Sequence, residues 1–321
     1  MIRVNEELDS IDLEIVDRLE QEGYRKQRIA NQIGLSRYTI SRRIKALFHK
    51  GIINGGQVIL NPLIQNNARI TLAEFKTNPH EPWIARSLMN DENCDILYGI
   101  TGEYSLFARF KLCDEIEFDK FLKRIDIMMA NTLFKKYQFI HVIECFKENG
   151  IIIKEKQPFN HKVDRIDCII LQVLKNQQRF INKPRPMTSM DVSRVLTRMN
   201  LPLSQPAVFR RIQRLKQVEI ILKEGVRINY HKLGFQTRFI MKVKVNPRVY
   251  SSMAREHLAP MKEITDLYRT NEDYGLLAFV LVRDVNNYSN FLTQLYDTTN
   301  IIDTYSTLVL DNQTNKQTIS N

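Results

Sequence analysis

The sequence of 321 residues contains few cysteines, with no Cys-x-x-Cys pair and no histidine at metal-ligand spacing beside any of them. A structural zinc site needs such clustered ligands, so the composition argues against one and favours reduced, buried thiols. The sequence predicts neither a metal site nor a cofactor. The scattered cysteines are Cys94, Cys113, Cys145 and Cys168.

Long apolar runs are also missing. The longest run, residues 276–282, is too short to cross a membrane and predicts a buried strand. Residues 1–7 lack the apolar stretch of a signal peptide, so we expect a cytoplasmic protein.

Positively charged residues outnumber negatively charged ones. The formal net charge is +11 and the isoelectric point is near 9.4. A strongly basic chain favours a polyanionic partner, and without a basic amphipathic helix the expected partner is nucleic acid and not a membrane. With 43% apolar and 26% charged residues, the chain has an ordinary globular balance and is long enough for two or more domains.

Residues 35–47 predict a short capped helix with a basic exposed face. Ile40, Ile44 and Leu47 fall at helical spacing and form a buried stripe, and Ser36 stands where an N-cap is needed. The side chains opposite or beside that stripe are expected to contact DNA, and with the capping serine they are Ser36, Arg37, Tyr38, Ser41, Arg42 and Lys45.

The segment just upstream completes a helix-turn-helix pattern. Residues 27–34 give a helix followed by a glycine turn, and residues 8–19 give an earlier helix with Asp9 as its cap and Gly23 as its end. In this motif the first helix of the pair crosses the phosphate backbone, which assigns Arg28 to phosphate contact, and the second enters the major groove. The three helices predict a winged-type DNA-binding domain.

The chain then changes to an αβ pattern. After Gly51, residues 52–62 predict a short extended segment, a glycine turn and a strand. The order that follows is strand, helix, strand, strand, helix, strand, which is the ferredoxin-like split βαβ plan. These elements are expected at residues 69–78, 83–89, 96–100, 104–110, 116–127 and 138–146.

The whole pattern occurs a second time. Residues 163–167 match residues 8–12, and residues 204–215 match residues 36–47 position for position. The second copy differs by an insertion at residues 180–186. Its DNA-facing candidates are Gln205, Phe209, Arg210, Gln213 and Arg214.

The expected fold class is therefore α+β, with two copies of a winged-type helix-turn-helix domain followed by a ferredoxin-like αβ (RAM) domain. Because a sheet of this kind leaves one face uncovered, we expect the two αβ domains to pack on each other. The predicted divisions are residues 1–62 and 63–150 for the first copy, a linker at 151–162, residues 163–230 and 231–311 for the second copy, and a disordered tail at 312–321.

Each half resembles the Lrp/AsnC family of prokaryotic transcription regulators. The resemblance rests on Leu8-Asp9-x-x-Asp12, on Ile33-Gly34-Leu35-Ser36 with Arg43, on Gly51-Ile52-Ile53 and on the αβ pattern. It implies a sequence-specific regulator that binds double-stranded DNA and dimerises through its αβ domain. Because this chain carries both copies, we expect an intrachain pseudo-dimer, and whether chains pair further stays open.

The resemblance also implies a small-molecule effector site at the turn between the second and third strands of the αβ domain. The family pattern has a glycine followed three residues later by an aspartate, whereas this chain has Ser105 at that place and the second copy has Gly275. The nature of the effector, an amino acid or another small molecule, stays open. The candidate effector residues are Gly102, Glu103, Tyr104 and Ser105.

Two alternatives remain. Siroheme decarboxylases resemble the same regulators in fold, but the turns at residues 98–105 and 268–275 contain no histidine and no nucleophile–base constellation is visible, so we expect no enzyme. A partner of related regulators that does not itself bind DNA is the other alternative, and the basic residues Arg42, Lys45 and Arg210 argue against it.

Overall fold

The computed structural model describes residues 8–61, 69–112, 115–154, 163–298 and 300–312. The chain divides into two compact units, each built from two separate stretches of sequence. Unit 1 comprises residues 1–64 and 156–235, and unit 2 comprises residues 65–155 and 236–321. In the described part of the chain, no helix is both long and apolar enough to span a membrane. The predictions for residues 1–7, Cys113, most of the linker and residues 313–321 lie outside the described residues.

Unit 1 begins with a group of three helices whose ends fall where the sequence predicts them. The Asp9 side chain accepts from the Asp12 amide at 2.8 Å, and Ser36 accepts from the Thr39 amide at 3.1 Å. Gly34 ends the second helix with φ of 76°, a left-handed conformation that favours glycine. The helices are α1 (Ser10–Glu22), α2 (Lys26–Ile33) and α3 (Arg37–His49), and Ile40, Ile44 and Leu47 are buried as predicted.

A second three-helix group follows the linker. Asp164, Thr188 and Ser204 cap its helices, and the first two of these caps are reciprocal capping boxes. Val208, Ile212 and Leu215 are buried and repeat the stripe of α3. The elements are α6 (Arg165–Lys175), the 3-10 turn η1 (Gln177–Arg179), α7 (Ser189–Arg198), α8 (Gln205–Gln217) and the 3-10 turn η2 (Tyr230–Leu233).

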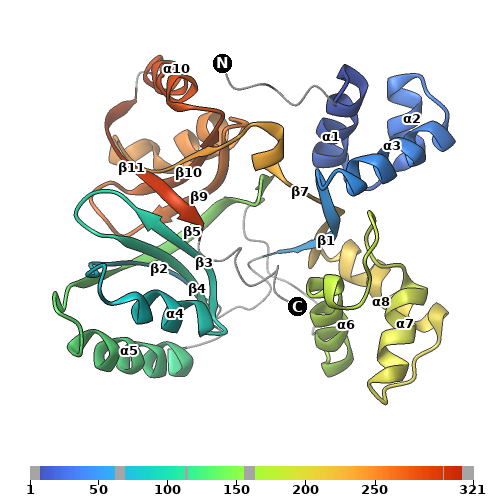
Figure 1. Ribbon diagram of the computed structural model, residues 1–321, viewed down its shortest axis with the longest axis horizontal. Helices are drawn as coiled ribbons and strands as arrows, with labels where there is room; N and C mark the ends of the chain where they lie inside the picture. Colours follow the sequence, from blue (N-terminus) through green and yellow to red (C-terminus); the bar gives the residue numbers. More distant parts are fainter. Residues whose placement is uncertain (1–7, 62–68, 113–114, 155–162, 299, 313–321) are drawn as a thin grey trace. The chain divides into compact units, whose positions relative to one another are not determined.

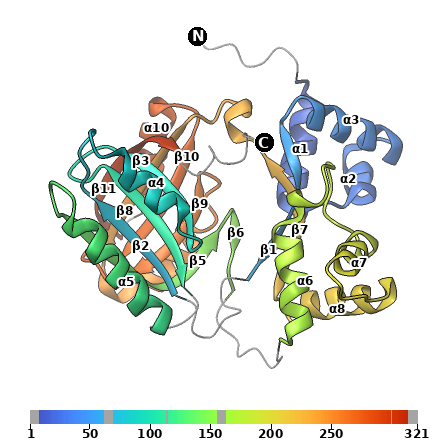
Figure 2. The same ribbon diagram turned by 60° about the horizontal axis from the view of Figure 1, so that its bottom comes forward.

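Two strands connect the three-helix groups of unit 1, as Figures 1 and 2 show. Strand β1 (Ile53–Leu60) follows the first group and pairs antiparallel with β7 (Ile221–Ile228), which follows the second. Each strand packs into the other group: Val58 of β1 contacts the core of the second group, and Val226 of β7 belongs to the core of the first. The two groups therefore share their strands, and neither core is complete without the other group.

The glycine turn predicted at residues 55–56 is wrong, because both glycines lie inside β1. The register of β1 against β7 shifts between Ile53 and Gly56, which is where a bulge replaces the turn. A Cβ atom on Gly56 would lie 2.2 Å from the carbonyl oxygen of Arg185. The bare backbone of Gly56 thus lets the inserted segment of the second group lie directly against the first group's strand.

Unit 2 contains the αβ elements of both stretches. Two predicted bounds differ from the structure. Ile151–Ile152, predicted as linker, pair as a short hairpin strand with β5 (Tyr137–Glu148), and Asn312, predicted as tail, is the last residue of β11 (Ile301–Asn312). The elements are β2 (Arg69–Phe75), α4 (Pro82–Asn90), β3 (Cys94–Ile100), β4 (Leu106–Leu112), α5 (Glu115–Ala130), β5 (Tyr137–Glu148), β6 (Ile151–Ile152), β8 (Thr237–Val245), η3 (Pro247–Val249), α9 (Tyr250–Ser252), the π-helical turn η4 (Met253–Leu258), β9 (Ile264–Thr270), β10 (Leu276–Val282), α10 (Val285–Tyr296) and β11 (Ile301–Asn312).

The strands of unit 2 close into a barrel. Within the first stretch the order is β5-β2-β4-β3, and within the second it is β11-β8-β10-β9, which is the ferredoxin-like order in both cases. Strand β3 pairs with β11, and β5 pairs with β9, so the two sheets join at both edges. The prediction that the two αβ stretches pack on each other is confirmed, and Leu72, Phe107 and Leu277 are fully buried.

The helices of unit 2 cover the outside of the barrel (Figures 1 and 2). One outer core packs α4 and α5 on the first sheet, and a second packs α10 and η4 on the second sheet. The alternate side chains of the strands face inward. This inner layer includes buried charged residues that belong to neither outer core: Glu74, Arg109 and Asp266.

Candidate DNA-binding surface and effector turn

The face of α3 opposite its buried stripe carries the predicted contact residues. Arg37, Tyr38, Arg42 and Lys45 are exposed, and 79% of Tyr38 is accessible. Neither Arg37, Arg42 nor Lys45 makes a hydrogen bond or ion pair with another described residue. Unpaired cations on an exposed helix face are available to phosphates and base edges.

Ser41 is placed differently from its neighbours on α3. It is half-buried, and its hydroxyl accepts from Lys26 Nζ of α2 at 3.1 Å. Burial, reinforced by the positive charges of Arg37, Lys45 and Arg185, lowers the pKa of Lys26. Several cations therefore gather around the junction of α2 and α3.

Arg43 connects α3 to the start of α1, a role that the sequence pattern did not assign to it. Its Nη1 lies 2.7 Å from Asp9 Oδ2 and 2.7 Å from Asp12 Oδ1. Hydrogen bonds from the Asp12 amide and from Arg43 lower the pKa of Asp9, and the two carboxylates raise the pKa of Arg43.

The second group has the same clamp. Arg211 Nη1 lies 2.7 Å from Asp164 Oδ2 and 2.7 Å from Asp167 Oδ1. The signal for both clamps lay in the sequence as a repeated Asp-x-x-Asp pair with a distant arginine. Only the folded helices show that these residues meet.

The predicted phosphate contact on α2 is already engaged. Arg28 is exposed, but its Nε lies 2.6 Å from Glu22 Oε2 at the end of α1. An ion pair of this kind at the surface is weak and can be exchanged for a phosphate.

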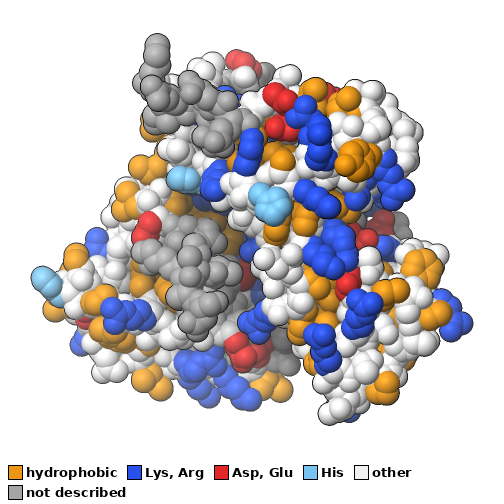
Figure 3. All heavy atoms as spheres, turned by 45° about the vertical axis from the view of Figure 1, so that its right-hand side comes forward, with side chains coloured by type: hydrophobic (Ala, Val, Ile, Leu, Met, Phe, Trp, Pro, Cys, Tyr) orange, Lys and Arg blue, Asp and Glu red, His pale blue; other side chains and the backbone are white. Residues whose placement is uncertain are grey.

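The exposed face of α8 is less basic than that of α3. Arg210 and Arg214 are exposed, while Gln213 is half-buried. Gln205 donates from Nε2 to Ser189 Oγ at 2.8 Å, and 48% of Phe209 is accessible. In Figure 3, lysine and arginine side chains are spread over the face of the molecule that it shows.

The inserted segment of the second group brings one more cation toward the first. Arg185 Nη1 lies 2.7 Å from Asp191 Oδ2. Burial opposes ionisation of Asp191, but hydrogen bonds from Arg185 and Thr188 outweigh it and hold the pKa of that carboxyl well below its usual range. Arg185 is also close enough to Tyr24 and Lys26 to act on them electrostatically.

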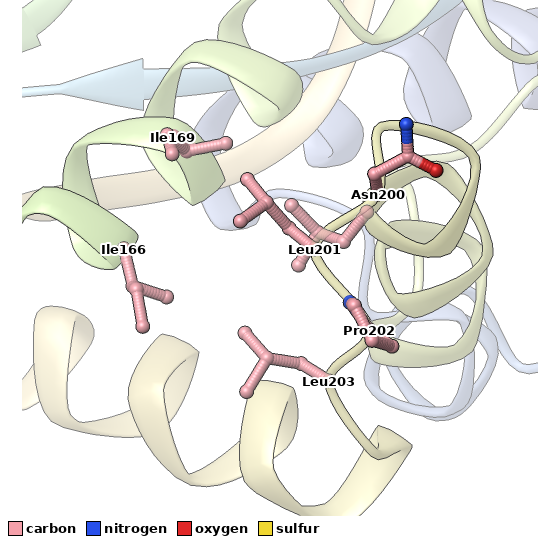
Figure 4. Close-up of a pocket in the computed structure, with 7 residues that line it drawn as sticks. Ile166, Ile169, Asn200, Leu201, Pro202 and Leu203 are labelled. Carbon is pink, nitrogen blue, oxygen red and sulfur yellow. The ribbon is translucent and has the colours of Figure 1, made fainter.

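The longer turn between α7 and α8 borders an apolar pocket of about 170 Å³, shown in Figure 4. Ile166 and Ile169 of α6 form one side, and the turn residues form the other. Ile169 takes the place that Glu14 has in the first group, so an apolar side chain lines the pocket where the first group's sequence has a carboxylate. The remaining lining residues are Leu196, Asn200, Leu201, Pro202 and Leu203.

The candidate effector turn lies between β3 and β4, and its polar groups are used locally. Ser105 Oγ accepts from the Thr77 amide at 2.7 Å, and Glu103 pairs with Lys136. Lys136 Nζ lies 5.5 Å from the centre of the Tyr104 ring. Hydrogen bonding from Lys136 lowers the pKa of Glu103.

Gly102 is the remaining candidate in this turn. It is exposed and has φ of 105°, so a side chain there would be strained. The four candidates Gly102, Glu103, Tyr104 and Ser105 therefore lie together in one turn, with their charges already paired.

The corresponding turn of the second stretch, residues 271–275, is held by lysines of β8. Glu272 Oε2 lies 3.0 Å from Lys242 Nζ, and Asp273 Oδ2 lies 2.7 Å from Lys244 Nζ. A Cβ atom on Gly275 would lie 1.5 Å from Arg269 Nη1, so the guanidinium of Arg269 lies against the bare backbone of this turn. The described residues contain no group of three or more His, Cys, Asp or Glu side chains placed to hold a metal ion.

An exposed basic helix on a three-helix group, together with a ferredoxin-like αβ domain, defines a class of transcription regulators that join a helix-turn-helix to a ligand-binding domain. The Lrp/AsnC ligand binding domain family matches residues 238–318. The HTH-type transcriptional regulator LrpA of Pyrococcus horikoshii is 30% identical over 104 residues, which are 32% of this chain and 72% of that protein. The chain belongs to the Lrp/AsnC family of transcription regulators.

Two further similarities bear on the length of the chain. The HTH-type transcriptional regulator Ptr1 of Methanocaldococcus jannaschii is 27% identical over 149 residues, which are 46% of this chain and 92% of that protein. The crystal structure of the siroheme decarboxylase NirDL has a TM-score of 0.63 at 12% identity, covering 94% of this chain and 92% of that one. At this identity the second likeness concerns the fold alone.

Proposed function

We propose that this regulator binds double-stranded DNA through the exposed faces of α3 and α8. The observation that carries the proposal is the set of unpaired cations on α3, held on a helix that Arg43 ties to α1. A helix fixed to its neighbours presents its side chains to the major groove in one orientation.

We propose further that the chain is a two-copy form of the family, an intrachain pseudo-dimer. Its domain divisions are those predicted from the sequence, with residues 151–152 and 312 moved into the αβ stretches. Ptr1 matches over 92% of its own length but only 46% of this chain, which leaves room for a second copy. The shared strands β1 and β7 and the closed barrel of unit 2 support the same view.

The exposed faces of α3 and α8 carry different side chains, which predicts an operator with two different half-sites. A homodimer reads a palindrome because its two recognition helices are identical. Here Tyr38 corresponds to Pro206, and Lys45 corresponds to Gln213. The operator should therefore contain two different half-sites about 10 base pairs apart, or a multiple of that spacing.

The proposal is tested by selecting bound fragments from genomic DNA and footprinting the enriched sequence with the full chain. Two unlike half-sites protected by one chain are the expected result. A single short palindrome under one chain would contradict the contribution of α8, and no enrichment would contradict DNA binding itself.

For the effector, we propose that the turn of Gly102 to Ser105 takes a small molecule that competes for the Glu103–Lys136 pair. Binding of individual amino acids by calorimetry, with Glu103→Gln as the variant and Glu92→Gln on the exposed surface as the control, tests this assignment.

A siroheme-decarboxylase-like activity is the second candidate, favoured by the NirDL fold likeness over nearly the whole chain. Among the described histidines, His49, His80, His231 and His257 are exposed and His141 is half-buried. Titration with an iron tetrapyrrole, followed by the visible absorbance, decides between the candidates: a saturable spectral shift favours the enzyme, and its absence together with DNA binding favours the regulator. The third alternative, a partner of related regulators, predicts that neither DNA nor tetrapyrrole binds.

A further inference from the structure

Two equivalent positions inside the barrel of unit 2 carry opposite charges. Glu74 in β2 and Lys242 in β8 are each followed, four residues later, by an Asn-Pro pair, so they correspond in the two copies. Both side chains face inward, because the residues beside Glu74, Ala73 and Phe75, belong to the outer core on their sheet.

These two equivalent residues contact each other across the interior. Lys242 Nζ lies 3.3 Å from Glu74 Oε2, and the side chains are only 12% and 7% accessible. Gln138 donates to the same carboxylate oxygen, and Glu272 Oε2 lies 3.0 Å from Lys242 Nζ. Burial lowers the pKa of Lys242, but Glu74 and Glu272 outweigh it and raise that pKa, so the lysine remains charged.

When equivalent positions meet, the contact depends on which copies pair. Two first copies would bring Glu74 against a second Glu74, and two second copies would bring Lys242 against a second Lys242. Like charges placed together in a buried site repel each other, and each lysine would then keep only its own Glu272 as a counter-charge. The unlike pairing adds the contact between Glu74 and Lys242.

A second buried contact also differs between the two copies, because its charged residues have apolar equivalents. Arg109 of β4 donates from Nη1 to Asp266 Oδ1 of β9 at 3.0 Å, and both side chains are at most 5% accessible. The position equivalent to Arg109 is Phe279, and the position equivalent to Asp266 is Ile96. Pairing of two second copies would therefore place Asp266 against Phe279, leaving a buried carboxylate without its arginine.

We propose that Glu74, Lys242, Arg109 and Asp266 determine which αβ segments pair, so that a first segment accepts only a second segment, in the same chain or in another. The proposal rests on the two-copy form proposed above. A buried polar contact that fixes the partner is a known use of such residues in other folds.

The test uses the full chain with its charges exchanged one at a time and together. Glu74→Lys reproduces the lysine–lysine contact of two second copies, and Lys242→Glu reproduces the carboxylate–carboxylate contact of two first copies. The combined Glu74→Lys, Lys242→Glu chain restores opposite charges at these two positions, with Glu272 unchanged beside them. Lys120→Glu, on the exposed surface of α5, is the control for a charge reversal outside the barrel.

Urea unfolding without DNA provides the measurement. Each single exchange should raise the unfolding equilibrium constant by about 30-fold or more, and the combined exchange should recover most of that loss. If a single variant fails to fold, the combined chain still decides the result. A combined chain as unstable as the less stable single variant, or single variants as stable as Lys120→Glu, would overturn the proposal.

A mixing experiment tests pairing between chains. Within its own chain, each of a tagged Glu74→Lys chain and an untagged Lys242→Glu chain has like charges at positions 74 and 242. When the two are refolded together, pairing of a first segment from one chain with a second segment from the other gives opposite charges at these positions. Capture on the tag should retain more untagged chain than the same experiment with wild-type chains, and equal capture would overturn pairing between chains. Because neither measurement uses DNA, loss of DNA binding alone would contradict the proposed function and leave this proposal standing.

Discussion

The two three-helix groups of unit 1 share their buried half and differ in their exposed half. Both use an arginine on the third helix to clamp two aspartates of the first helix at 2.7 Å. In contrast, the face of α3 offers Tyr38 and Lys45 where α8 offers Pro206 and Gln213. Packing constrains the buried positions in both groups, so sequence change is concentrated where a different DNA sequence could be read.

The largest expected effect is the dependence of DNA affinity on salt. With roughly six phosphates neutralised, log affinity should fall with log salt at a slope of about −5, which is about 1,000-fold between 50 and 200 mM salt. Removing the α8 cations with Arg210→Gln and Arg214→Gln should reduce the slope by about 2 if both contact phosphates. Fluorescence anisotropy over a salt series measures the slope for the wild type and for the variant. A wild-type slope shallower than about −2 would contradict a DNA-binding role.

A matched pair of double variants tests whether α3 contributes more than α8. Arg42→Ala with Lys45→Ala should weaken operator binding by about 100-fold, because both unpaired cations are lost from the groove-facing surface. Arg210→Ala with Gln213→Ala should weaken it by less than about 10-fold. Competition against random DNA measures the lost specificity, and equal losses from the two helices would show that they contribute alike.

The shared clamp should behave alike in both groups. Arg43→Ala and Arg211→Ala should each raise the unfolding equilibrium constant by about 5-fold near neutral pH, since the contacts are partly solvated. The pKa values of Asp9 and Asp164 are lowered, so this stabilisation is present above the ordinary carboxyl pKa and is lost as the pH falls through the lowered values. Urea unfolding at neutral and acidic pH measures the loss of stability of each variant relative to the wild type. A variant that remains equally destabilised in acid would contradict the clamp as the cause.

The smallest effect is expected at Arg28. Because its Nε already pairs with Glu22, Arg28→Ala should weaken binding by about 3-fold, equally for operator and random DNA. Glu22→Gln is the matched variant, since it releases Arg28 and should not weaken binding. A loss at Arg28 that depends on the DNA sequence would move this residue from backbone to base contact.

Local signals account for most of what could be predicted. Capping residues, terminal glycines and apolar spacing predict α1, α2 and α3. Each of these signals depends only on residues within one or two turns of the helix. The seven residues of β10 were predicted without error, since an uninterrupted apolar run fits a strand with both faces covered.

The failures come from contacts between distant parts of the chain. Gly55-Gly56 has the composition of a turn, but its role is to let the backbone of Arg185 lie close, and that residue is far away in sequence. Arg43 lies in α3, while its two aspartates lie at the start of α1, so no pattern within either helix predicts their contact. Likewise, Glu74 and Lys242 look like ordinary strand residues until the barrel brings them together.

The closed barrel also sets the order in which the protein can be completed during synthesis. In the described chain, the edges of β3 and β5 are covered by β11 and β9, which are made after the whole first αβ segment. Until then, the first αβ segment presents two open strand edges and a largely apolar inner face, the kind of surface that aggregates with other incompletely folded chains. The growing polypeptide is therefore most vulnerable to aggregation in the interval before its last strand emerges, and a nonsense mutation upstream of Ile301 should yield insoluble protein.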